Sequence, residues 1–280
     1  MGVRRPFRWR EPSVLPGFGP AFSLVILYLG LIVLIPLAAL VARPWEHGIS
    51  GFIETVTEPR VLAALRLSFG AALLASVVSA VMGLVAAWAL TRYEFPFRGL
   101  LDAAIDLPFA LPTAVAGIAL ASLYSANGWI GSVIEPLGLK IAYTPTGIFV
   151  ALLVVGLPFV VRSVQPVLAD FDVEAEEAAM TLGARPVQTA FRVILPALMP
   201  ALLSGFSLAF ARAVGEYGSV IFIAGNMPMK SEIAPLLIIT KLEQFNYAGA
   251  ASIGLAMLVL SFISLVIINR LQLALGRRGA

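Results

Sequence analysis

The sequence contains no cysteine and only one histidine, His47. Without cysteine the chain can form no disulfide and has no thiol nucleophile, and one histidine is too few for a Cys/His zinc site. A Ser-His relay would have to be built on His47 alone. We therefore expect neither an enzyme nor a metal site, and no cofactor bound by this chain.

Charge is also scarce. Only 12% of the 280 residues are charged, whereas soluble domains have about 25%, and 60% are hydrophobic. The mean hydropathy is +0.95. This composition indicates a polytopic membrane protein. The net charge of +3 comes from arginines scattered between apolar segments, which fits membrane topology better than a nucleic-acid surface, so we expect no nucleic-acid partner.

Six segments are apolar enough to cross a membrane, which takes about 20 residues as helix because lipid offers no hydrogen bonds to an open backbone. We predict an all-α bundle of six transmembrane helices in one domain over residues 1–280. The expected spans are at about 18–42, 62–91, 104–125, 146–166, 197–224 and 249–271. The first is too long for a cleaved signal peptide, whose apolar region is usually about 7–15 residues, so we expect it to be retained.

Lysine and arginine predict the orientation. With the N-terminus inside, twelve of these residues fall on the cytoplasmic side and five on the outer side. The positive-inside rule then predicts that both termini are cytoplasmic.

Prolines interrupt two of the predicted spans. Pro108 and Pro112 are one turn apart in the third, and Pro158 and Pro166 lie in and after the fourth. Proline removes a backbone donor and kinks a helix. Transporters use such breaks to line a cavity, but proline is also common in membrane helices, so both interpretations stay open.

The predicted cytoplasmic loop 167–196 is too long for a simple helical connection and should have structure of its own. A helix from about Val173 to Leu182 would place Ala175, Ala178, Ala179 and Leu182 on one narrow apolar stripe. The three alanines would let another backbone approach closely.

The chain should turn sharply after this helix. Gly183 is suited to ending a helix, and Pro186 to starting the next one, which we expect from about Val187 to Leu195. The two helices would form a compact projection. From the residues alone, a solvated loop with helix-forming composition is the alternative.

The stretch "EAAMTLGARPVQTAFRVILP" resembles the EAA motif of ABC importer permeases. The matching residues are Glu177, Ala178, Ala179, Gly183, Val193, Leu195 and Pro196, with Val193 in place of the usual isoleucine. The resemblance implies that this loop is a coupling helix that inserts into a groove on a separate ATPase subunit. The chain has no G-x-x-x-x-G-K-[ST] motif, so ATP and Mg²⁺ would be bound by that partner.

Two longer stretches, "LTRYEFPFRGLLDAAIDLPFALPTAVAGIALASLYSANGW" and "ARAVGEYGSVIFIAGNMPMKSEIAPLLIITKLEQFNY", resemble the T-type permeases of sulfate/thiosulfate ABC importers. The resemblance implies a bacterial inner-membrane complex with a W-type second permease, two ATP-binding subunits and a periplasmic sulfate-binding protein, serving sulfur assimilation. A molybdate/tungstate permease is the nearest alternative. An autonomous secondary anion transporter would leave the EAA-like loop without a purpose, and an intramembrane enzyme would lack a plausible histidine or cysteine constellation.

Several charged residues lie in or next to the predicted spans. Arg212 and Glu216 are four residues apart near the middle of the fifth span, where a charge costs about 2.5–3.5 kcal/mol unless it meets protein or water. They are either a structural ion pair or part of the translocation path. Asp102 and Asp106 are expected to cap a helix or meet Arg98. Glu232, in the last outer loop, is expected to be surface charge or to touch the binding protein.

Overall fold

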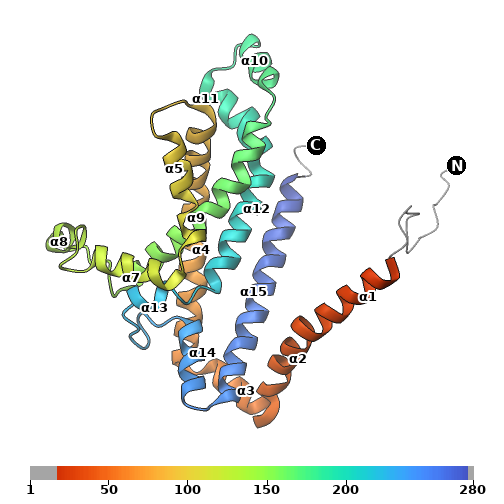
Figure 1. The fold of residues 1–280 in the computed structure, drawn as a ribbon, viewed down its shortest axis with the longest axis vertical. Helices are drawn as coiled ribbons and strands as arrows, with labels where there is room; N and C mark the ends of the chain where they lie inside the picture. Colours follow the sequence, from red (N-terminus) through yellow and green to blue (C-terminus); the bar gives the residue numbers. More distant parts are fainter. Residues whose placement is uncertain (1–17, 277–280) are drawn as a thin grey trace.

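The computed structural model describes residues 18–276, except for the side chains of His47 and residues 273–276. Within residues 18–276 the chain is helical and contains no strand, which confirms the all-α prediction. The helices form an elongated bundle with one helical hairpin projecting from its upper end (Figure 1). The arginines before residue 18, those after residue 276 and the side chain of His47 lie outside the described part.

Three long helices make the centre of the bundle. They are α4 (Pro59–Arg92), α9 (Pro145–Ala169) and α12 (Leu195–Val214), and each packs on the other two. Small residues set the spacing: a Cβ on Gly83 would lie 2.7 Å from Cβ of Val160, and one on Gly205 would lie 2.8 Å from Cα of Val160. Val160 is fully buried. Small residues allow such close backbone approach, which is how helices associate where lipid provides little hydrophobic drive.

The first helix stands apart from this centre. It runs from Phe18 to Glu46 as α1 (Phe18–Tyr28), a π-helical turn (Leu29–Leu34), α2 (Ile35–Ala42) and the start of a 3₁₀ turn (Arg43–His47). It is apolar on all sides, and neither α1 nor α2 has a buried residue. Its far end meets α15 (Tyr247–Gly276) and α3 (Gly48–Thr57) at the base of the bundle (Figure 1). A helix with this composition needs lipid or another protein around it.

The predicted span 104–125 is not one continuous helix. The structure has α5 (Arg98–Ile105), α6 (Leu107–Ala110) and α7 (Thr113–Tyr124) instead. Leu111 and Pro112 are extended, because proline disfavours helical conformation in the residue before it. With 12 residues, α7 is about 18 Å long, too short to cross a bilayer. The part of the chain that the structure describes therefore has five helices of membrane length rather than six.

The predicted span 197–224 also differs. Its helix begins earlier, with α11 (Pro186–Thr189) and a π-helical turn η4 (Ala190–Ile194), and is continuous to Val214. The chain is then irregular until α13 (Val220–Ile223), followed by α14 (Ala234–Glu243). Ten residues predicted as span therefore lie outside the helix. α4, α9 and α15 cover the segments 62–91, 146–166 and 249–271.

Candidate functional site

The projecting hairpin begins with α10 (Val173–Thr181), close to the helix expected from Val173 to Leu182. Asp172 caps it: the backbone N–H of Glu174 donates a hydrogen bond of 3.0 Å to Oδ1 of Asp172. Glu174 and Glu176 lie in the first turn, where negative charge is favoured by the helix dipole. A helix of this length is marginal alone, so these local interactions matter.

Gly183 makes the corner after α10. Its φ is +83°, in the left-handed region that only glycine enters at little cost. The N–H of Gly183 donates to the carbonyl of Met180 at 2.9 Å, and the N–H of Ala184 donates to that of Ala179 at 3.0 Å. This pair of bonds is a Schellman motif, which ends the helix and reverses the chain.

The second arm of the hairpin is continuous with α12. The N–H of Arg185 donates to Oε1 of Gln188 at 2.8 Å, and Pro186 starts α11. The sequence predicted that this helix would end at Leu195, but it continues through Pro196 into α12. The ring of Pro196 would clash with the carbonyl four residues earlier, and the chain is π-helical there, over Ala190–Ile194. The second arm of the hairpin is therefore joined to α12 by continuous helix.

The tip and the second arm of the hairpin expose apolar side chains. Leu182 is 88% exposed, and Met180, Val187 and Phe191 are also exposed. The predicted stripe is split: Ala178 and Leu182 are exposed, whereas Ala175 and Ala179 are half-buried. Of the other motif residues, Glu177, Gly183 and Pro196 are exposed, and Val193 and Leu195 are half-buried. A projecting, exposed apolar tip of this kind is suited to docking on another protein.

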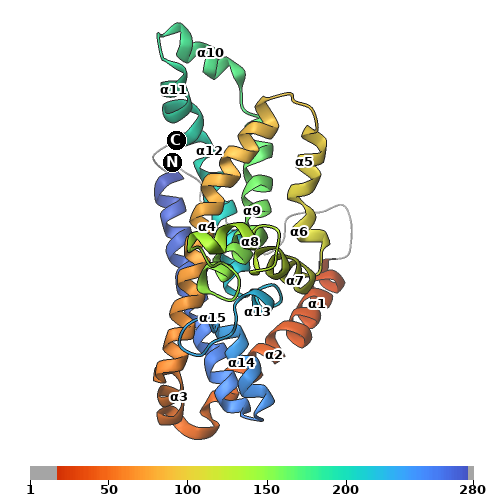
Figure 2. The same ribbon diagram turned by 90° about the vertical axis from the view of Figure 1, so that its left-hand side faces the viewer.

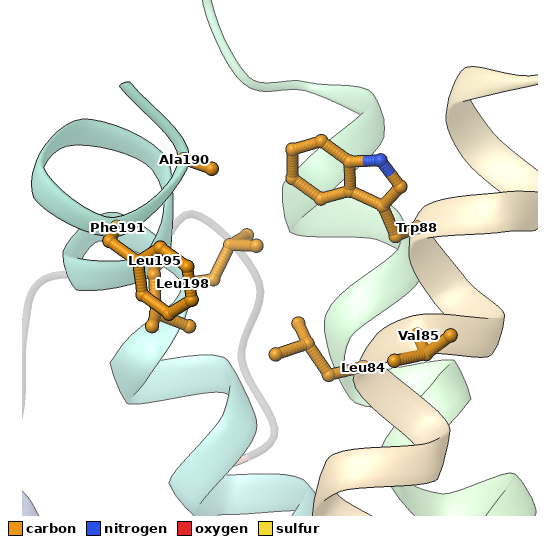
Figure 3. A pocket seen from close by; sticks show the side chains of 7 residues that line it. All are labelled: Leu84, Val85, Trp88, Ala190, Phe191, Leu195 and Leu198. Carbon is orange, nitrogen blue, oxygen red and sulfur yellow. The ribbon is translucent and has the colours of Figure 1, made fainter. Parts of the chain in front are cut away.

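An apolar groove lies beneath the second arm, between it and α4 (Figure 3). Its volume is about 230 Å³. Leu195 of the motif lines it, facing side chains of α4 that include Leu84 and Trp88. The full lining is Leu84, Val85, Trp88, Ala190, Phe191, Leu195 and Leu198.

An ion pair that the sequence did not reveal joins the hairpin to the core. Nη2 of Arg92, at the end of α4, donates a hydrogen bond to Oε1 of Glu176 on α10. The two residues are 84 positions apart. In the sequence, Arg92 is only one of the twelve lysines and arginines predicted to be cytoplasmic, and no local pattern relates it to Glu176.

Arg212 and Glu216 form the ion pair that the sequence suggested, with Nη1 of Arg212 2.5 Å from Oε2 of Glu216. Its position differs from the prediction, because Arg212 is in the last turn of α12 and Glu216 lies beyond the helix end. Glu216 is 2% exposed, and its Oε1 accepts hydrogen bonds of 2.9 Å from both the N–H and the hydroxyl of Ser219. The Arg212 side chain is 36% exposed. The carboxylate thus fixes a guanidinium that still reaches the surface.

The irregular segment around Glu216 packs against the break in the third predicted span. A Cβ on Gly218 would lie 2.2 Å from Oγ1 of Thr113, and one on Gly117 would lie 2.3 Å from the carbonyl oxygen of Ser219. Two interrupted helices therefore meet where Arg212 and Glu216 lie. Interrupted helices that meet inside a bundle are a feature of transport pathways.

Two other expectations about charged residues are wrong. Asp102 and Asp106 bind Arg162 of α9 instead of capping a helix or meeting Arg98. Glu232 is buried and accepts hydrogen bonds from Nε and Nη2 of Arg60, at 2.8 and 2.7 Å, so it is neither surface charge nor free to touch a partner. Among the side chains that the structure describes, there is no group of three or more metal-ligating residues.

Residues 79–278 match the family model "Binding-protein-dependent transport system inner membrane component". The chain is 48% identical over 265 residues to the sulfate transport system permease protein CysT of Salmonella typhimurium, covering 95% of this chain and 96% of that protein. It is 47% identical over 252 residues to the probable sulfate transport system permease protein cysT of Nephroselmis olivacea, covering 90% and 89%.

Solved structures with the same fold include a bacterial ABC transporter for import of the acidic polysaccharide alginate. The TM-score is 0.75 at 14% identity, covering 91% of this chain and 94% of that one. The bacterial alginate transporter in complex with its pentasaccharide-bound periplasmic protein gives a TM-score of 0.76, also at 14% identity, covering 92% and 94%. At this identity the likeness concerns the fold.

Proposed function

The chain belongs to the binding-protein-dependent transport system inner membrane components, and from this premise we propose that it is the permease subunit of an ATP-driven sulfate importer. The observation that carries the proposal is the similarity to sulfate permeases along almost the whole chain. Thiosulfate, which presents similar tetrahedral oxyanion chemistry, is expected to be a second substrate.

The hairpin of residues 173–195 supports a partner that hydrolyses ATP. We infer that α10 docks in a groove on an ATP-binding subunit, with Glu177, Ala178 and Ala179 in the contact and Gly183 setting the reversal. Leu195 and Pro196 lie where the second arm joins α12. The complete importer would contain this chain, a W-type permease, two ATP-binding subunits that hold ATP and Mg²⁺, and a periplasmic sulfate-binding protein.

The hairpin also gives the proposed orientation. If α10 meets a cytoplasmic ATPase, the end of the bundle that carries it faces the cytoplasm, and α3 and α14 at the opposite end face the periplasm (Figure 1). Both termini are then cytoplasmic, in agreement with the distribution of lysine and arginine. The first helix would be retained, and residues 1–280 would form one permease domain in the bacterial inner membrane.

We infer that Arg212 lies on the sulfate path. Glu216 receives two hydrogen bonds from Ser219 on one oxygen and the Arg212 guanidinium on the other. The guanidinium has five donors, and its exposed part can bind a passing oxyanion while Glu216 keeps it in place. Because Glu216 neutralises the charge, the anion would be held weakly, as a path requires. A purely structural ion pair is the alternative, and the variant Arg212→Gln separates the two.

The function is tested in cells that lack this gene and carry their own partner genes. Restoring the chain is expected to restore uptake of radiolabelled sulfate, with competition by thiosulfate and loss of uptake when ATP is depleted. Restored uptake of molybdate without sulfate would show a molybdate/tungstate permease instead. Sulfate uptake into vesicles that contain this chain alone, without ATP, would indicate an autonomous secondary transporter.

A further inference from the structure

α10 is connected to the three core helices in three ways, of which only two are covalent. Residues 170–172 join it to α9, and the Gly183 corner with α11 and η4 joins it to α12. Its packing is mainly on α11 and η4, within its own hairpin. The third core helix, α4, has no chain connection to α10. The ion pair between Arg92 and Glu176 connects them.

The environment of this ion pair makes it firmer than an exposed one. The side chains of Arg92 and Glu176 are only 22% and 20% exposed. The guanidinium carbon of Arg92 also lies 5.7 Å from the centre of the Trp88 ring, which it covers. Trp88 in turn lines the apolar groove against Phe191 of the second arm (Figure 3). Partial burial and the aromatic face reduce screening by water, so the pair should be stronger than a typical surface ion pair.

We propose that Arg92 and Glu176 form a coupling strut, a positioning pair through which movement of α10 is passed directly to α4. The inference rests on the proposed function, since it assumes that an ATPase moves α10. Without the strut, displacement of α10 would reach α4 only indirectly, through its packing on α9 and α12, and the short linkers would absorb part of it. With the strut, the hairpin acts directly on all three core helices. Neither residue belongs to the EAA pattern, so this role is additional to that of the motif.

The proposal is tested in the assembled complex, reconstituted with its partner subunits and binding protein, using radiolabelled sulfate and phosphate release. Arg92→Gln and Glu176→Gln are each expected to lower the sulfate transported per ATP by about fivefold or more, the lower end of the range for energetic coupling between sites. ATP hydrolysis itself is expected to persist. Arg92→Gln/Glu176→Gln is expected to be no worse than either single variant, because both remove the same interaction.

Glu174→Gln is the matched control. Glu174 lies on the same helix two residues away and is exposed, with no ion pair among the described residues. It is expected to keep the wild-type ratio of sulfate to ATP. Ratios within about twofold of wild type in both single variants, with normal assembly, would overturn the strut, since energies below about 0.4 kcal/mol are too small for a coupling role. A parallel loss of transport and ATP hydrolysis would also overturn it, because that is the result of a merely structural pair.

A second measurement covers variants that assemble poorly. The chain has no native cysteine, so Arg92→Cys/Glu176→Cys places the only two thiols of this subunit at the strut. Bridging them with a short bifunctional thiol reagent is expected to raise the sulfate-to-ATP ratio of the same preparation toward wild type. No change on bridging would contradict the proposal. Failure of the proposed function is distinguishable, because then wild-type complex would show no ATP-dependent sulfate uptake at all.

Discussion

Arg162 holds Asp106 through two parallel hydrogen bonds, with Nε 2.8 Å from Oδ1 and Nη2 2.6 Å from Oδ2. Its Nη1 also lies 2.8 Å from Oδ1 of Asp102 and 2.7 Å from Oε1 of Gln165. These bonds fasten α5, which runs beside α9 in Figure 2, to that helix. The three charged side chains stay 32–45% exposed, so this polar contact lies at the surface of the bundle.

Replacing Arg162 with glutamine is expected to destabilise the protein by up to about 1 kcal/mol, because two partly exposed carboxylates lose their charged donor. The measurement is the melting temperature of the purified complex in detergent. Arg98→Gln is the matched control, since Arg98 starts α5 but has no ion pair with Asp102 or Asp106. Equal shifts for the two variants would contradict the assigned partner.

Gly183→Ala is expected to weaken the hairpin through its backbone conformation alone. A Cβ there would meet nothing within 4 Å, but φ is +83°, which costs other residues about 1–2 kcal/mol. Sulfate transport should fall about 5- to 30-fold if this energy opposes the docked hairpin. Gly70→Ala, in α4, also has free space around its Cβ and has no positive φ, so it is expected to behave as wild type. Full transport by Gly183→Ala would show that the Schellman corner is dispensable.

Gly205→Ala is expected to be destabilising for a different reason, the lack of space. Its Cβ would lie 2.8 Å from Cα of Val160 and 3.1 Å from Cβ of Ser163, so α12 and α9 would have to separate. Overpacking of this kind costs about 1–3 kcal/mol. The loss of stability is measured by thermal unfolding of the complex, with Gly70→Ala again as the control. An unchanged melting temperature would mean that the helices are packed less closely than described.

Arg212→Gln is expected to lower sulfate uptake per assembled complex about tenfold or more, because the oxyanion loses a charged donor worth about 1.5–3 kcal/mol. Assembly is followed by the amount of permease recovered with the ATPase subunit. Arg212→Lys keeps the charge without the planar fork of the guanidinium. Its sulfate uptake is expected to lie between that of wild type and that of Arg212→Gln.

Arg60→Gln is the comparison for this variant, since it leaves Glu232 without its guanidinium partner at a site outside the proposed path. Arg60→Gln is expected to reduce stability rather than the transport rate of assembled complex. Normal uptake by well-assembled Arg212→Gln complex would leave Arg212 with a structural role only.

Local sequence patterns were enough to predict much of the molecule. The turn at Gly183 and the pairing of Arg212 with Glu216 depend on residues within a few positions of each other, where spacing and side-chain chemistry decide the outcome. The long helices follow from apolar length alone. Proline positions indicated that the third span would be interrupted, but not that it would separate into α5, α6 and α7.

The ion pairs between distant segments could not be predicted in this way. Arg162 and Asp106 are 56 residues apart, Arg92 and Glu176 are 84 apart, and Arg60 and Glu232 are 172 apart. Each pairing depends on how helices are rotated and offset against one another, which a single sequence does not encode locally. Arg92 and Arg162 are among the twelve lysines and arginines predicted to be cytoplasmic. That prediction explained their positions by membrane orientation and gave no indication of their carboxylate partners.

The contacts of Gly83 and Gly205 with Val160 limit how the protein can change shape. α9 packs closely on both α4 and α12 there, which restricts sliding or rotation of either helix against α9. We therefore expect the three helices to tilt together during transport, as one stiff lever. The contacts that open and close during transport are then expected around these three helices, where neighbouring subunits and the broken helices pack against them.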